Sequence, residues 1–396
     1  MLSKDMIALG QRRSVIREIF EYGNQRAKEV GRENIFDFSL GNPNVPAPNL
    51  VRETICNLAE GDPVALHGYT SAQGSAEVRQ ALADDVNRRF GTSYTGDCFY
   101  ITMGAAAALA CVFRALACPG DEFIVFAPFF PEYEMFIRYG AGAKCVIVPP
   151  SFADFQIPLD ELEKRLTNKT KAVVINSPNN PSGAVYSMET IRRLTDLLRQ
   201  KEKEYGHPIY LISDEPYREI VFDNITLPFL PSLYDDTIIC YSYSKSLSLP
   251  GERIGYILVP PEATDNSLLY AAVCGAGRSL GYVCAPSLFQ KVAAACVGQT
   301  SDISVYQTNR DLLYNSLLQM GYSCVKPGGA FYLFPRTLED DDEAFCERAK
   351  KYDLLLVPGV GFGAPGHMRI SYCVQTETIQ RALPLFEALA KEYCAR

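Results

Sequence analysis

Short apolar segments recur between about residues 98 and 260, and several of them alternate with amphipathic segments. The apolar runs have the length of buried strands and cover 98–102, 122–127, 143–149, 172–176, 209–214, 237–242 and 253–259. In the intervening segments 104–117, 159–166 and 188–204, apolar residues repeat at three- and four-residue steps, as in amphipathic helices. Alternating strands and helices predict an α/β fold with a mostly parallel sheet of seven strands.

The pattern changes after about residue 286. A long amphipathic helix is expected there, and a closing helix from about 376; between them the short predicted strands are 323–327, 330–335, 354–358 and 368–373. A helix near 15–30 precedes the large sheet, and we expect it to pack on this C-terminal unit. Because 396 residues exceed the size at which one core keeps growing, we predict two domains. These are a large domain of residues 46–286 and a smaller, discontinuous α+β domain of residues 1–45 and 287–396.

Composition excludes several classes of function. A net charge of −8 disfavours nucleic acid as a partner, because binding to phosphate backbones needs concentrated Lys and Arg. The thirteen cysteines contain no C-x-x-C pair and the three histidines have no metal-ligand spacing, so we expect reduced core cysteines, no metal site and a cytoplasmic protein. The N-terminal segment lacks the apolar core of a signal peptide, and Arg114 interrupts the apolar run 101–118, so no membrane association is expected.

Candidate ligand-binding residues follow the predicted strands, because parallel sheets bind ligands at the carboxyl ends of their strands. After the run 98–102 the chain passes directly into an Ala-rich helix, whose free backbone N–H groups suit a phosphate. A packed helix start is the alternative. After 172–176 comes the segment NSPNNPSG, in which the amide of Asn180 could donate to a phenolate oxygen. A purely structural turn is the alternative for this segment.

Two further strand ends carry charged residues. Asp214 ends the run 209–214, and a buried carboxylate needs a partner. It could cap a helix or keep the ring nitrogen of a cofactor protonated. Lys245 follows the run 237–242, and Arg253 comes eight residues later. Lys245 could be a solvated surface lysine, but the neighbouring serines, the arginine and a nearby aspartate favour a lysine that forms a Schiff base.

In their order and separations, these motifs resemble those of the class I/II aminotransferases of fold type I. The resemblance extends over nearly the whole chain, and its most specific parts are NPSG at 180–183, DEPY at 214–217, SYSK at 242–245 and RIG at 253–255. It implies a fold type I transferase that depends on pyridoxal 5'-phosphate (PLP). The implied reaction moves an amino group from an L-amino acid to a 2-oxo acid such as 2-oxoglutarate by a ping-pong Schiff-base mechanism.

The resemblance also implies a role for each matching residue. Lys245 would form the Schiff base and shuttle the substrate proton, and Asp214 would pair with the ring nitrogen. Asn180 and Tyr217 would bind the ring oxygen. The other contacts implied for the cofactor are the backbone amides of Ala105 and Ala106, the side chains of Ser242, Ser244 and Arg253, and the stacking ring of Phe130. Tyr69 would reach the phosphate of the neighbouring subunit in a homodimer. The family more often has a polar side chain near Ala106, and its loss would weaken phosphate binding without removing the backbone donors.

The residues expected to bind substrate follow from the same resemblance. Arg369, in MRIS at 368–371, would grip the α-carboxylate as a planar bidentate donor, with Gly41 and Asn180 beside it. A surface arginine and an ordinary turn glycine are the alternatives. An acidic substrate needs a second cation, which Arg12 and Arg13 could supply unless they face solvent. Aspartate is the leading expectation for the substrate, followed by alanine and aromatic amino acids.

Two other functions use the same fold. A PLP-dependent lyase or decarboxylase would carry the same cofactor residues and differ in its products. A PLP-binding sensor domain of a transcription regulator would carry an additional basic DNA-binding module, which the acidic composition disfavours. The expected partners are therefore small amino and 2-oxo acids and a second copy of the chain, with no nucleic acid and no membrane.

Overall fold

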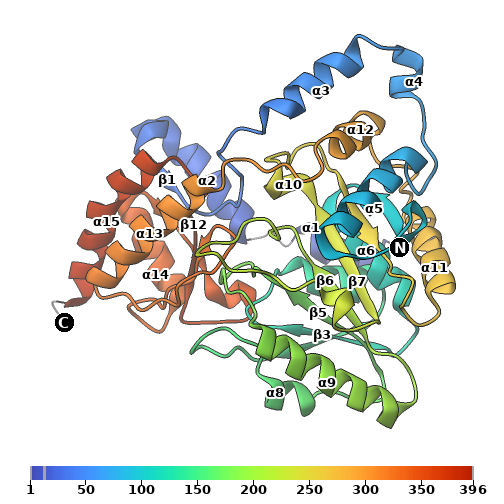
Figure 1. Cartoon of the computed structure of the whole chain (residues 1–396). Helices are drawn as coiled ribbons and strands as arrows, with labels where there is room; N and C mark the ends of the chain where they lie inside the picture. Colours follow the sequence, from blue (N-terminus) through green and yellow to red (C-terminus); the bar gives the residue numbers. More distant parts are fainter. Residues whose placement is uncertain (1, 12–14, 395–396) are drawn as a thin grey trace.

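A seven-stranded sheet with helices on both faces forms the larger part of the computed structural model, which describes residues 2–11 and 15–394 (Figure 1). The strand order is β2-β8-β7-β6-β5-β3-β4. The five strands from β7 to β4 are parallel, and β8 runs antiparallel to its neighbours β2 and β7. The strands are β2 Phe99–Thr102, β3 Glu122–Phe126, β4 Lys144–Val148, β5 Thr170–Asn176, β6 Tyr210–Asp214, β7 Thr237–Ser242 and β8 Gly255–Leu258. The mostly parallel seven-stranded sheet predicted from the sequence is confirmed.

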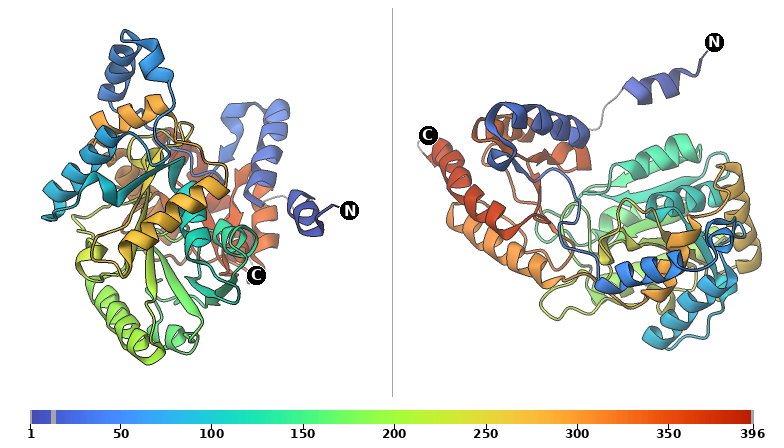
Figure 2. Two further views of the ribbon diagram at one scale, coloured as in Figure 1. Left: turned by 90° about the vertical axis from the view of Figure 1, so that its right-hand side faces the viewer. Right: turned by 90° about the horizontal axis from the view of Figure 1, so that it is seen from above.

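Burial explains why these runs are strands. Every residue of β2, β3, β6, β7 and β8 is buried, so the sheet needs apolar side chains on both faces. Helices α6 (Gly104–Leu116) and α11 (Asn266–Ser279) pack together beside one face, and α8 (Leu159–Glu163) and α9 (Met188–Tyr205) cover the other (Figures 1 and 2). Helix α9 begins where the Ser187 side chain accepts a hydrogen bond from the backbone of Thr190, and it ends at Gly206 in the left-handed conformation.

The C-terminal elements form a second group beside the sheet. Its helices are α13 Ser304–Gln319, α14 Asp342–Ala349 and α15 Thr376–Cys394, and its strands are β9 Tyr332–Leu333, β10 Leu354–Leu355, β11 Val357–Pro358 and β12 Met368–Ser371. Strands β11, β12 and β9 form an antiparallel sheet. The N-terminal strand β1 (Phe36–Asp37) pairs in parallel with β10, and helix α2 (Val15–Val30) contacts β10 and β11. Helix α1 (Lys4–Gln11) has no buried residue and stands apart from the rest of the chain (Figure 2).

Three sequence predictions need correction. The predicted strand 323–327 forms no strand, since Pro327 lacks the N–H that a ladder needs and a glycine-rich turn follows it. The predicted helix 159–166 ends at Glu163. The long helix expected after 286 is two helices, α12 (Ser287–Ala295) and α13, because the chain turns at Gly298 with a φ of 74°.

The division into a 46–286 domain and a 1–45 plus 287–396 domain stays a proposal. Helix α12, just beyond that boundary, packs on α3 (Asn49–Ala59), α4 (Pro63–His67) and α5 (Ala76–Phe90) rather than on the C-terminal elements. Its buried residues Val292 and Ala293 belong to the core beside β2 and β8. Across the described ranges 2–11 and 15–394, every helix is too short or too polar to span a membrane.

Candidate active site

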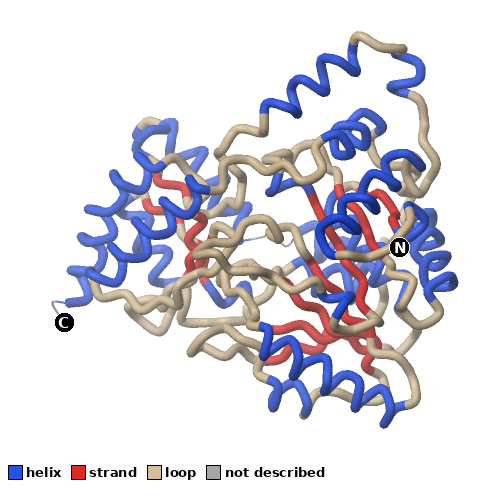
Figure 3. Tube along the Cα trace, in the orientation of Figure 1, coloured by secondary structure: helices blue, strands red, loops and turns tan. Residues whose placement is uncertain are grey.

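The carboxyl ends of β5 and β6 lead into loops, and that of β7 leads into the short helix α10 (Tyr243–Ser246), between the large sheet and the C-terminal elements (Figure 3). A cavity of about 280 Å³ lies there. Among the described residues, its lining includes every predicted cofactor or substrate residue except Tyr69, namely Gly41, Ala105, Ala106, Phe130, Asn180, Asp214, Tyr217, Ser242, Ser244, Lys245, Arg253 and Arg369. The fold thus brings together residues that are spread over more than three hundred positions of the sequence.

Asp214 is a buried carboxylate with one oxygen unused. Its Oδ2 accepts a hydrogen bond from the Tyr133 hydroxyl at 2.5 Å, whereas Oδ1 is buried without any partner in the structure. Burial raises the pKa of Asp214 to about 7; the Tyr133 hydrogen bond acts in the opposite direction. A helix cap is therefore not its role, because a capping carboxylate would accept backbone N–H groups. The free oxygen instead suits a protonated nitrogen of a ligand.

Lys245 lies in the one-turn helix α10 (Tyr243–Ser246), directly after β7. Its Nζ donates to the carbonyl oxygen of Gly41 at 2.6 Å and lies 5.5 Å from the centre of the Phe331 ring. Burial lowers the pKa of this amine to about 8, and the positive charges of Arg253 and Arg369 contribute. An amine with this pKa is available as a nucleophile and base near neutral pH, unlike a solvated surface lysine.

A set of hydrogen-bond donors lines one end of the cavity. Helix α6 begins at Gly104 with no side chain capping it, so the backbone N–H groups of Ala105 and Ala106 are available. Arg253 Nη1 donates to Ser244 Oγ at 3.2 Å, and the Ser244 hydroxyl lies 2.7 Å from that of Ser242. Gly104 has a φ of +79°, and a Cβ there would lie 2.6 Å from Arg253 Nη2. The glycine is required for this close approach of the guanidinium to the helix start.

Arg369 is a buried cation without a carboxylate partner. Its Nη1 donates to Asn180 Oδ1 at 3.1 Å and its Nη2 to the carbonyl oxygen of Ser39 at 2.5 Å, whereas Nε is buried and unpaired. The guanidinium stacks on Tyr332 and Phe362, and it is only 3% exposed. Burial lowers its pKa. Within residues 2–11 and 15–394 no acidic side chain neutralises this charge, so a surface role is excluded and an anionic ligand is expected.

The remaining predicted residues complete the cavity wall. Asn180 accepts from Arg369 through Oδ1, which leaves its Nδ2 free to donate into the cavity. The Tyr217 hydroxyl lies 2.9 Å from that of Tyr332, and Phe130 packs edge-on against Tyr133 at 5.7 Å. Tyr69 lies outside the cavity and is 90% exposed. Its predicted contact with a second subunit stays a prediction, and Arg12 and Arg13 lie outside the described residues.

Sequence reasoning missed three residues that support the site. Tyr133 binds Asp214, Asn176 donates from Nδ2 to the Asp214 carbonyl oxygen at 2.8 Å, and Tyr332 contacts both Tyr217 and Arg369. Asn176 could have been found, because it is the last residue of a predicted strand. Tyr133 and Tyr332 carry no such signal, since their partners are distant in the sequence.

Comparison with known proteins identifies the family. The protein-family model described as "Aminotransferase class I and II" matches residues 33–385. The chain belongs to the class I and II aminotransferases. It is 32% identical to an aspartate aminotransferase of Thermotoga maritima, over 90% of this chain and 91% of the relative. It is 30% identical to an aspartate/prephenate aminotransferase of Thermus thermophilus, over 92% and 93%.

Solved structures of aminotransferases have the same fold. An aminotransferase from Eubacterium rectale superimposes with a TM-score of 0.97 at 57% identity, over 99% of both chains. The Thermus thermophilus aspartate aminotransferase with maleate superimposes with a TM-score of 0.84 at 28% identity, over 98% of this chain and 100% of that one. These similarities show that the chain is a PLP-dependent aminotransferase of fold type I.

The cavity of this aminotransferase fits PLP. The unpaired Oδ1 of Asp214 suits a pyridinium N–H, and the amine of Lys245 suits an aldehyde carbon. The helix start at Ala105 and Ala106, together with Arg253, offers the donors that a phosphate needs. The cavity therefore offers a partner to the ring nitrogen, to the aldehyde and to the phosphate of the cofactor.

Proposed function

We propose that this aminotransferase transfers the amino group of an L-amino acid, with aspartate as the leading donor, to a 2-oxo acid such as 2-oxoglutarate in a ping-pong reaction. The observation that carries this proposal is the buried, uncompensated charge of Arg369 beside the lysine site. Arg369 and Lys245 both donate to the segment 39–41, at Ser39 and Gly41. A substrate whose α-carboxylate binds Arg369 would thus place its α-amino group toward Lys245.

The cofactor would be held by the residues that line the cavity. Arg253, the hydroxyls of Ser242 and Ser244 and the backbone amides of Ala105 and Ala106 would bind its phosphate, and Phe130 would stack on the ring. Asn180 and Tyr217 would donate to the ring oxygen. Asp214 would stay ionised opposite the ring nitrogen and so raise the pKa of that nitrogen. Bound PLP supplies an electron sink that delocalises the charge developing at the substrate Cα.

Lys245 would have two tasks in this scheme. Its amine would anchor the cofactor in the resting enzyme, and after displacement by the substrate amine it would take the proton from Cα as a general base. The lowered pKa of Lys245, about 8, supports the second task because part of the amine is then unprotonated near neutral pH. Gly41, which accepts from Nζ through its carbonyl oxygen, would help to orient the amine.

Aspartate is favoured as the amino donor because the Thermotoga maritima and Thermus thermophilus relatives are both named for aspartate. Its side-chain carboxylate would need a cation besides Arg369. Among the described residues of the cavity, the positively charged side chains are Lys245, Arg253 and Arg369, and the proposal already assigns each of them. Arg12 and Arg13 remain the candidates, because they precede Ile16, which lines the cavity.

The test uses the PLP-saturated enzyme and a panel of aspartate, alanine and tyrosine, without an acceptor. We expect aspartate to give one equivalent of oxaloacetate per subunit and then stop, and added 2-oxoglutarate to restart the reaction and yield glutamate. A faster reaction of alanine or tyrosine would replace aspartate as the donor. Release of ammonia with continued turnover would instead indicate a lyase.

The homodimer is part of the same proposal. The exposed Tyr69 has no hydrogen bond within the described chain, as expected of a side chain that reaches a neighbouring active site. Light scattering should give twice the chain mass of 43.9 kDa. Tyr69→Phe should weaken PLP binding without dissociating the dimer, whereas a monomeric active enzyme would contradict this part of the proposal.

A further inference from the structure

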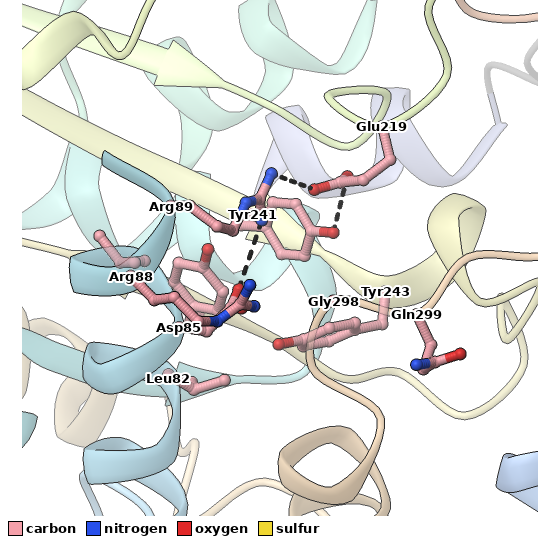
Figure 4. A pocket seen from close by; sticks show the side chains of 11 residues that line it. Leu82, Asp85, Arg88, Arg89, Glu219, Tyr241, Tyr243, Gly298 and Gln299 are labelled. Atoms are coloured by element: carbon pink, nitrogen blue, oxygen red, sulfur yellow. Dashed lines mark hydrogen bonds and ion pairs between the residues drawn. The ribbon is translucent and has the colours of Figure 1, made fainter. Parts of the chain in front are cut away.

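A second cavity, of about 220 Å³, is lined by Tyr241 and Tyr243, which flank Ser242 in the sequence (Figure 4). It is bounded by helix α5, the end of β7, strand β8 and the turn at Gly298. Its lining residues are Leu82, Asp85, Val86, Arg88, Arg89, Glu219, Tyr241, Tyr243, Tyr256, Gly298 and Gln299. None of these residues lines the cofactor cavity.

The two cavities share a strand but use opposite faces of it. Successive side chains of an extended segment point to opposite sides, so Ser242 lines the cofactor cavity whereas Tyr241 and Tyr243 line the second one. The Tyr241 hydroxyl also lies 3.0 Å from Oγ of Ser246, the residue after Lys245. The second cavity is thus distinct from the active site and directly adjacent to it.

Every carboxylate oxygen in the second cavity already accepts a hydrogen bond. Asp85 accepts from Arg88 through Oδ1 and from Arg89 through Oδ2, the latter at 3.4 Å. Glu219 accepts from Arg89 at 3.2 Å and from the Tyr241 hydroxyl at 2.8 Å (Figure 4). These two acids and two arginines balance in charge, and their acceptors are satisfied without a ligand.

Hydrogen-bond donors, in contrast, remain unused. The hydroxyls of Tyr243 and Tyr256 have no partner among residues 2–11 and 15–394, although the two side chains are only 6% and 8% exposed. Burial raises the pKa of both phenols, so they remain protonated donors. Arg88 uses a single N–H, toward Asp85, and keeps the others. Neither hydroxyl is sealed inside the protein, so both face the second cavity and can donate to a ligand with acceptor oxygens.

The size and lining of the second cavity define this ligand further. Its volume is below that of pockets for drug-sized molecules, which begin at about 300 Å³. Its charged side chains sum to zero, which favours a monoanion over a dianion. Leu82 and Val86 add an apolar wall. We propose that the second cavity binds a small organic monocarboxylate, with the carboxylate on Tyr243, Tyr256 and Arg88 and the apolar part against Leu82 and Val86.

The test is calorimetric titration of the PLP-bound enzyme with benzoate and with its neutral analogue benzamide. Because Arg369 could also bind benzoate, the titration is made in an Arg369→Gln background, which leaves the second cavity intact. We expect one equivalent of benzoate per chain and no binding of benzamide. Absence of benzoate binding in this background would overturn the proposal, as would equal binding of benzamide.

Variants of the second cavity locate the bound molecule. Added to the Arg369→Gln background, Tyr243→Phe with Tyr256→Phe should weaken benzoate binding at least about tenfold, because two donors to a charged acceptor are lost. Arg88→Gln changes a side chain that is 68% exposed, so it tests the same site without a risk to folding. The matched control is Tyr139→Phe, an exposed tyrosine outside both cavities. Unchanged affinity in both the Tyr243/Tyr256 and Arg88 variants would contradict the proposal.

Discussion

Tyr133 donates a 2.5 Å hydrogen bond to one oxygen of Asp214 and leaves the other oxygen, buried and unpaired, facing the cofactor cavity. Both side chains are buried, and the two residues are 81 positions apart. The tyrosine stabilises the ionised form of a carboxylate whose surroundings favour the neutral form. The proposed pairing of Asp214 with a ring nitrogen needs the ionised carboxylate, and therefore depends on the hydrogen bond from Tyr133.

Tyr133→Phe should lower kcat about tenfold while PLP stays bound, since a hydrogen bond to a charged group contributes roughly 1.5–3 kcal/mol. The change weakens the ionised form of Asp214, so the acidic limb of the pH–rate profile should move to higher pH. Steady-state kinetics between pH 5.5 and 8.5 measure both effects. Tyr139→Phe, at an exposed position, is the control. A wild-type profile for Tyr133→Phe would show that Asp214 does not depend on this bond.

The raised pKa of Asp214 also predicts how the PLP-free protein responds to pH. The folded state binds this proton more tightly than the unfolded state, with a pKa of about 7 against 3.8, so stability is lost as pH rises through this interval. Asp214→Asn removes that loss. Between pH 5.5 and 8.5 the free energy of unfolding of Asp214→Asn should rise by about 2 kcal/mol relative to that of the wild type. Urea denaturation of both proteins without PLP measures this difference. A constant difference between the two proteins over this interval would mean that Asp214 does not titrate there.

Lys245→Ala should lower kcat at least about 100-fold, because it removes both the amine that anchors the cofactor and the proposed general base. Lys245→Arg should be as inactive, since a guanidinium keeps the positive charge but stays protonated. Product formation from aspartate and 2-oxoglutarate measures the loss. Lys203→Ala, in the exposed part of α9, is the control. Substantial activity of either Lys245 variant would remove this residue from its proposed role.

Gly104→Ala should weaken PLP binding and leave the rest of the fold intact. The residue has a φ of +79°, which costs an alanine about 1–2 kcal/mol, and the new methyl group would meet the guanidinium of Arg253. Fluorescence titration of the PLP-free protein would give the dissociation constant. Gly275→Ala is the matched control, because a Cβ at that helical position meets nothing within 4 Å. Equal PLP affinity of the two variants would contradict the proposed phosphate site.

The large sheet could be predicted because its strands are buried on both faces and therefore read as continuous apolar runs. Polar residues at the ends of these runs then indicated most of the site, since parallel strands bring their carboxyl ends to one edge. The strands β9, β10 and β11 have two residues each, too few for a periodic pattern, so their bounds were not predictable. The segment 323–327 has the composition of a strand, but Pro327 lacks the N–H that a ladder needs.

Side chains that act through distant partners were not predictable either. Tyr332 reaches the Tyr217 hydroxyl across 115 residues, and nothing near either tyrosine in the sequence marks the pair. The same holds for the second cavity, where Asp85 and Glu219 are joined by Arg89. Such networks depend on how elements pack, and packing is determined by the whole chain.

Arg369 supports the most specific prediction about substrate binding. Its guanidinium is buried without a carboxylate partner in the described chain, and its two donors to Asn180 and Ser39 hold it in place. Arg369→Gln should lower kcat/KM for amino acids at least about 100-fold, because truncating one partner of a buried charge pair costs roughly 2–5 kcal/mol. Arg369→Lys should recover only part of this, because an ammonium cannot bind a carboxylate in the bidentate manner. PLP affinity should remain unchanged in both variants.

Arg336→Gln, at an exposed arginine, is the control. A loss of PLP instead of substrate affinity would place Arg369 among the cofactor ligands and remove the proposed contact with the substrate carboxylate.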